Sequence, residues 1–212
     1  MGAETTLVNP SRLAAALDLG AGPAVRPAHF ALLDLQSSDE VQAIFSRLAP
    51  LIAEAESEGE IAALLDSPNW RLHLIAAAAL LLRGPSPGTL DALWERIEVG
   101  SWVAARLAAL AFLLDDRFAG KAKAWIEARY GPPSPPRGGI DGIWNVFSGQ
   151  TATALLALLK QLPETGPWVA DWEGRPTLAE ALAEGGEAGR TALDWRDGIS
   201  AEIGTFAVWR RA

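Results

Sequence analysis

Few side chains in this sequence are of the types that perform chemistry. The two histidines, His29 and His73, have neither a second histidine nor a carboxylate at metal-ligand spacing, so the sequence predicts no metal site. Cysteine is absent, which excludes thiol catalysis and disulfides. No nucleophile elbow, P-loop or dinucleotide-binding fingerprint occurs. We therefore assign no catalytic residue and no cofactor from the sequence.

Arg106 is the most informative charged residue, because it is the only charge between Trp102 and Leu114. A guanidinium in so apolar a helix is either paired or lines a cavity. Trp102 lies one helical turn earlier on the same face, within reach of a cation–π contact. An ion pair with Glu95 or Glu98 is the structural alternative.

His73 lies in a second apolar helix. We expect it to be buried or half-buried and bonded to a backbone carbonyl or to Asp66. The alternative is that it serves as a polar group in a ligand pocket.

Tryptophan is abundant, and it is the residue type common to cores and to binding hot spots. Five of the nine tryptophans follow residue 140. Trp168 and Trp172 flank turn residues, and we expect this pair to be partly exposed. The candidate contacts for a partner or ligand are Arg71, His73, Trp102, Arg106, Trp168, Asp171 and Trp172.

The charge of the chain limits its partners. The 212 residues carry a formal net charge of −8, which repels phosphate backbones and anionic lipid and favours a basic partner. The longest uncharged apolar run, Leu74–Leu82, has nine residues, short of the roughly twenty that a membrane span needs. With no visible secretory signal and no cysteine, we expect a cytoplasmic protein that binds neither nucleic acid nor membrane.

Helical periodicity positions these residues. Alanine and leucine are frequent and no stretch has a secure period of two, so we predict an all-α fold. Ser57-x-x-Glu60 fits a capping box that opens a short helix, Ile61–Leu65. Ile140–Phe147 and Thr151–Leu162 are expected to form a helix pair. The predicted regions are a mixed lead-in (1–37), helical repeats (38–130), a proline- and glycine-rich linker or loop (131–139) and a tryptophan-rich helical region packing on the repeats (140–212).

Two helix-length segments, Trp70–Leu82 and Trp102–Leu114, look like copies offset by 32 residues. Each follows a shorter amphipathic segment, and together they resemble HEAT repeats, the helix–turn–helix units of α-solenoids. The resemblance implies a short HEAT-like solenoid with additional helices at the C-terminus. It rests on Asp66, Pro68, Trp70, Leu72, Ala76, Ala79 and Leu80 in one unit and on Glu98, Trp102, Ala104, Ala108, Ala111 and Phe112 in the next.

The chain departs from the HEAT pattern in two ways. The family places an arginine in the second helix that bonds the loop aspartate of an adjacent repeat, whereas this chain has His73 and Ala105 there. Both second helices are also apolar nearly all round, so something must cover them. The cover could be the lead-in, the C-terminal region, a second copy of the chain or a partner.

Three functions remain open at this point. A non-catalytic protein-binding scaffold that favours a basic partner, for example an inhibitor or immunity-like protein, is the leading one. The second is a HEAT-like enzyme such as a DNA glycosylase or bilin lyase, although the sequence lacks the basic stripe that a glycosylase needs. The third is a structural protein that self-associates through its apolar helices.

Overall fold

The computed structural model describes residues 11–18, 28–34, 38–131 and 143–209. These ranges contain helices and no strand, which confirms the all-α prediction. Within them, no helix combines the length and hydropathy that a membrane span requires. The helices are α1 (Arg12–Asp18), α2 (Ala28–Asp34), α3 (Ser38–Ile52), α4 (Ser57–Asp66), α5 (Trp70–Arg83), α6 (Pro87–Val99), α7 (Ala104–Leu114), α8 (Phe118–Tyr130), α9 (Ile143–Leu159), the 3-10 turn η1 (Pro163–Thr165), α10 (Gly166–Glu173), α11 (Pro176–Gly185) and α12 (Ala188–Trp209).

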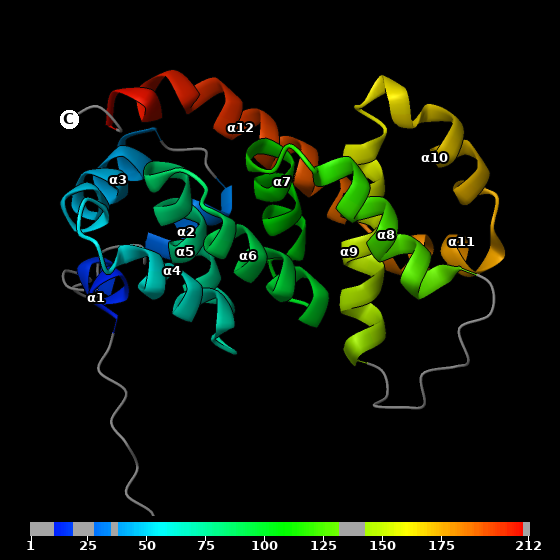
Figure 1. Cartoon of the computed structure of the whole chain (residues 1–212), viewed down its shortest axis with the longest axis horizontal. Coiled ribbons are helices and arrows are strands. Elements are labelled where there is room, and N and C mark those ends of the chain that lie inside the picture. The colour runs from blue at the N-terminus through cyan, green and yellow to red at the C-terminus, as the bar shows by residue number, and fades with distance from the viewer. Residues whose placement is uncertain (1–10, 19–27, 35–37, 132–142, 210–212) are drawn as a thin grey trace, which may run out of the picture.

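The two similar segments form α5 and α7, which lie at the centre of the molecule. Helix α4 packs on α5 and on α6, α6 packs on α7, and α7 also contacts α5, α8 and α9. The helices α5, α7 and α9 therefore form an inner row. Figure 1 shows α4, α6 and α8 following one another across the molecule as an outer row.

The chain itself covers the inner row. Ten consecutive residues of α5, His73–Leu82, are buried, as expected for a helix that is apolar on every side. Helices α1, α2 and α3 pack on α5, while α12 lies across α5, α7 and α9 (Figure 1). The buried face of α12 carries Ala188, Ala192, Trp195 and Ile199 at helical spacing. Two of the four expected covers, the lead-in and the C-terminal region, are thus both present.

The start of α4 differs from the prediction. The helix begins at Ser57, four residues earlier than expected, and the capping box does not form. The Ser57 hydroxyl donates instead to the carbonyl of Ile52, 3.0 Å away. The Glu60 carboxylate accepts from Arg12 of α1 rather than from the start of its own helix. A tertiary partner has replaced the local one.

Helix α9 is continuous, so the prediction of a helix pair between residues 140 and 162 is wrong within the described residues. Gly149 lies inside α9, where glycine is unfavourable unless packing requires it. A Cβ at Gly149 would lie 2.8 Å from the carbonyl oxygen of Ala181, and a Cβ at Gly185 would lie 2.6 Å from that of Gly149. The two glycines therefore allow α9 and α11 to approach backbone to backbone.

Candidate functional site

His73 joins two loops of neighbouring helix pairs and is fully buried. Its Nε2 donates to the carbonyl of Ser67 at 2.6 Å, and its Nδ1 accepts from the hydroxyl of Ser101 at 2.7 Å. The same hydroxyl oxygen accepts from the N–H of Val103. Burial lowers the pKa of His73 to about 4; the positive charge of Arg96 adds to this and the Ser67 carbonyl opposes it. His73 is therefore neutral at pH 7 and links the loop before α5 to the loop before α7.

Arg106 bonds to the end of α2. Its Nε donates to the carbonyl of Leu33 at 2.9 Å, and Trp195 of α12 donates from Nε1 to the adjacent carbonyl of Leu32 at 3.0 Å. The last carbonyls of a helix have no N–H donor within that helix. Donors from α7 and α12 thus complete the last turn of α2, and the Arg106 guanidinium contributes to the covered core.

Trp102 lies at the surface, away from the hydrogen bond between Arg106 and Leu33. It is 67% exposed, and its ring meets Phe147 of α9 edge-on with centroids 5.4 Å apart. Arg71 is also exposed, with its guanidinium over the ring of Trp70 at 4.7 Å. The structure therefore gives Trp102, Arg106 and Arg71 separate partners and does not bring them into one site.

Trp168, Asp171 and Trp172 come together on α10. The two indoles stack with centroids 5.2 Å apart, and Arg175 lies over Trp172 at 3.8 Å while donating to Asp171 at 2.7 Å. Trp168 donates from Nε1 to Glu127 of α8 at 2.8 Å. Trp172 is buried and Trp168 is half-buried. This cluster fastens α10 to α8, and the expected partial exposure holds for Trp168 but not for Trp172.

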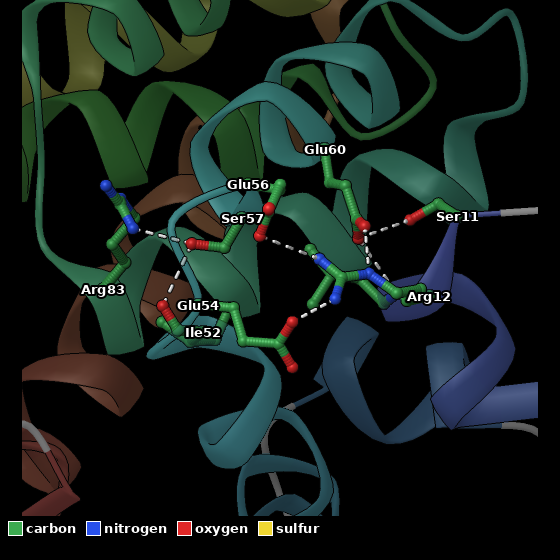
Figure 2. A network of polar contacts seen from close by, with 9 residues as sticks. Ser11, Arg12, Ile52, Glu54, Glu56, Ser57, Glu60 and Arg83 are labelled. Atoms are coloured by element: carbon green, nitrogen blue, oxygen red, sulfur yellow. Dashed lines mark hydrogen bonds and ion pairs between the residues drawn. The ribbon is translucent and has the colours of Figure 1, made fainter.

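Arg12 holds α1 to the acidic turn between α3 and α4 (Figure 2). Its guanidinium donates to Glu54 and, at 2.6 Å, to Glu60. Glu60 also accepts from the Ser11 hydroxyl and from the N–H of Leu13 at the start of α1, where a negative charge is favourable. These carboxylates therefore have partners within the protein.

An exposed acidic stripe that the sequence analysis did not single out runs along α6. Asp91, Glu95 and Glu98 are spaced four and three residues apart, so they share one face of the helix. We call these three residues the α6 acidic stripe. The helical spacing could have located it, but carboxylates at such spacing are frequent on ordinary solvated faces.

A groove lies on each side of the stripe. The α4–α6 groove has a volume of about 510 Å³ and the α6–α8 groove about 520 Å³, and Glu95 and Glu98 line both. The α4–α6 groove is lined further by alanines of both helices, by Val99 and by Arg96. Burial lowers the pKa of Arg96, an effect that the nearby Asp66 opposes.

The α6–α8 groove has aromatic walls. Trp94 and Trp125 line it together with Lys121. Trp94 donates from Nε1 to the buried carboxylate of Asp115 at 2.9 Å, and the Lys121 ammonium lies 3.2 Å from the same carboxylate. Burial alone would raise the pKa of Asp115, but bonds from the Arg117 N–H, Trp94 and Lys121 outweigh burial and hold that pKa below its ordinary value.

The carboxylates of the stripe differ in their pairing. Asp91 lies 3.7 Å from Lys121, and Glu98 lies 2.9 Å from Arg129 rather than near Arg106. Glu95 has no hydrogen bond or ion pair with any described residue. The lining of the α6–α8 groove thus has three carboxylates against one ammonium. Its middle carboxylate is available for a cation from outside.

No family model, curated protein or solved structure matches the chain. In the part of the chain that the structure describes, no group of three or more histidine and acidic residues is placed to hold a metal ion. The function is therefore inferred from the fold and from the α6 acidic stripe.

Proposed function

We propose that this protein is a non-catalytic, HEAT-like helical-repeat scaffold that binds a basic protein partner along the α6 acidic stripe. One observation carries the proposal: Glu95, a carboxylate without a partner among the described residues, lies between two grooves and lines both. Carboxylates attract the partner's lysine and arginine side chains, and the grooves receive the apolar side chains beside them.

The arrangement of helices supports the outer row as the binding surface. The pairs α4/α5 and α6/α7 stack in the order that a helical repeat requires. Helices α2 and α12 lie on the inner row, where a glycosylase of this type would need an open basic groove. Self-association was considered because the apolar helices need a cover, and α2 and α12 already supply one. The net charge of −8 favours fast encounter with a basic protein at low ionic strength.

A site-specific cross-linking experiment tests the proposal. A photoreactive amino acid replaces Ala124, an exposed residue that lines the α6–α8 groove, in one variant and Glu180, an exposed residue on α11, in the control. After irradiation in a lysate of the source organism, we expect position 124 to form adducts with a basic protein and position 180 to form none. Reversing the charge of the stripe in the double variant Asp91→Lys, Glu98→Lys should abolish the adduct.

Three outcomes would contradict the proposal. They are equal labelling at both positions, adducts only with acidic proteins, and an adduct whose yield does not change after the charge reversal.

A further inference from the structure

Two N–H donors next to the α6–α8 groove have no acceptor among the residues that the structure describes. Trp125 is only 6% exposed and lines the groove, yet its indole Nε1 makes no hydrogen bond with any described residue. The guanidinium of Arg129 lies over the same indole, 4.5 Å from the ring centroid, and its Nε also has no acceptor in the described part of the chain. A buried donor without a partner is unfavourable, and such donors are rare in folded proteins.

The indole N–H groups of Trp94 and Trp125 differ in their hydrogen bonding. Trp94 lines the same groove, and its Nε1 is satisfied by the Asp115 carboxylate. The described residues thus supply an acceptor for the indole of Trp94 and none for that of Trp125. At the same groove, Glu95 is an acceptor without a donor among the described residues. Within the described part of the chain, the Trp125 N–H therefore lacks an acceptor and the Glu95 carboxylate lacks a cationic donor.

We infer that the α6–α8 groove binds a peptide segment of the partner through an arginine residue, whose guanidinium pairs with Glu95 and whose segment offers a backbone carbonyl to the N–H of Trp125. This inference rests on the proposed function and names the chemistry of the segment bound there. A bare cation such as a polyamine or a metal ion satisfies Glu95 but offers no acceptor to an indole. A peptide supplies both groups within one residue.

Arginine fits this groove better than lysine does. Its planar guanidinium can lie against an aromatic face while its edge pairs with a carboxylate. Arg129 shows the same combination next to the groove, because it lies over Trp125 and donates to Glu98 at 2.9 Å. The Nε1 atom of Trp125 is enclosed by protein atoms. We expect Arg129 to move away from the indole when the segment binds.

Nuclear magnetic resonance of the full chain tests the inference. The indole N–H resonance of Trp125 is assigned by its absence in Trp125→Phe. The probes are the peptide acetyl-Arg-Ala-Arg-Ala-Arg-amide and, as a cation without a carbonyl, spermine. We expect the peptide to move this resonance downfield and to slow its exchange with water, because a new hydrogen bond forms. Spermine should shift the amide resonances of the stripe and leave the indole unchanged.

Affinities of two variants separate this inference from the proposed function. Glu95→Gln should lower the affinity for both probes. Trp125→Phe should lower the affinity for the peptide about fivefold, as expected for one lost hydrogen bond, and leave the affinity for spermine unchanged. If Glu95→Gln changes neither affinity, the proposed site itself is wrong. If Glu95→Gln weakens the binding of both probes but the peptide does not shift the wild-type indole resonance, only the peptide inference is overturned. The same holds if spermine shifts that resonance equally. If Trp125→Phe does not fold, the wild-type indole resonance is assigned from its through-space contacts to neighbouring assigned protons, and reading it keeps the test valid.

Discussion

The indole Nε1 of Trp195 donates to the carbonyl oxygen of Leu32 at 3.0 Å, across 163 residues of sequence. Both residues are buried. The next carbonyl, that of Leu33, accepts from Arg106 of α7. The last turn of α2 is therefore bonded both to the inner row and to α12, which covers that row. These bonds explain how the lead-in and the C-terminal helix close over the same apolar helices.

Replacing Trp195 by phenylalanine should destabilise the protein by about 1–3 kcal/mol, because the Leu32 carbonyl would be left buried without a donor. Urea unfolding followed by circular dichroism measures the effect. Trp102→Phe is the matched control: that ring is 67% exposed, so its loss should change the free energy of unfolding by no more than about 0.5 kcal/mol. Equal unfolding midpoints for the two variants would mean that the Trp195 bond contributes nothing.

Stability should fall on acidification because His73 is buried in its neutral form. Its pKa is about 4 in the folded protein against 6.5 for an ordinary histidine, so the unfolded chain binds a proton that the folded chain does not. The His73 contribution is complete above pH 6.5, decreases as the pH falls toward 4 and changes no further below that. The loss is about 3 kcal/mol.

Urea unfolding at pH 7.5 and at pH 4.5 measures this loss, with His73→Gln as the reference for the carboxylates, which also titrate in acid. The difference in stability between the two proteins should shrink at the lower pH. A difference that stays constant over this range, or a His73 ring resonance that titrates near pH 6.5 in the folded protein, would contradict the prediction.

Adding a methyl group at Gly185 should separate α9 from α11. In Gly185→Ala the new Cβ would overlap the Thr153 hydroxyl and lie 2.6 Å from the carbonyl oxygen of Gly149. We expect a destabilisation of about 1–3 kcal/mol from the forced shift. Gly120→Ala is the control, because Gly120 lies in α8 with no atom within 4 Å of its added Cβ. That variant should instead gain about 0.5–1 kcal/mol from helix propensity, and calorimetry of both compares the signs directly.

Removing the Asp115 carboxylate should destabilise the wall of the α6–α8 groove. Asp115→Ala deprives the Trp94 indole, the Arg117 N–H and Lys121 of their shared acceptor, for a loss of about 3 kcal/mol. Because the pKa of Asp115 is lowered by folding, its contribution is present at neutral pH and is lost in acid. Asp116→Ala, at the exposed neighbouring position, should have little effect on thermal unfolding. Equal melting temperatures for the two variants would rule out this role.

The periodicity of the sequence was enough to predict the helical fold and the positions of α5 and α7. A helix that is apolar on every side has one physical consequence, burial, and burial of α5 follows from composition alone. The same reasoning predicted that His73 bonds to a backbone carbonyl or to Asp66, and the first of these is found. Periodicity could not identify the carbonyl as that of Ser67, because this depends on how two loops meet.

The predictions that differ from the structure concern residues whose partners are distant in sequence. Arg106 bonds to a carbonyl 73 residues earlier, and Glu60 serves α1 rather than its own helix. Gly149 interrupts the helical pattern of the sequence but not helix α9 itself, since α11 packs against it. Local sequence rules predict hydrogen-bond partners within a few residues, whereas tertiary packing decides which partners distant in sequence are used. The α6 acidic stripe was visible as spacing, but the grooves beside it exist only once α4 and α8 are in place.

The position of α12 over α5 also sets an order of events during synthesis. Helix α5 ends at residue 83 and α12 begins at residue 188, so 105 residues (188 minus 83) separate an apolar helix from part of its cover. At typical ribosomal rates that interval lasts roughly 5–20 s. Throughout it, the side of α5 that α12 will occupy lacks this cover. We therefore expect nascent chains of this protein to present a hydrophobic surface that chaperones can bind.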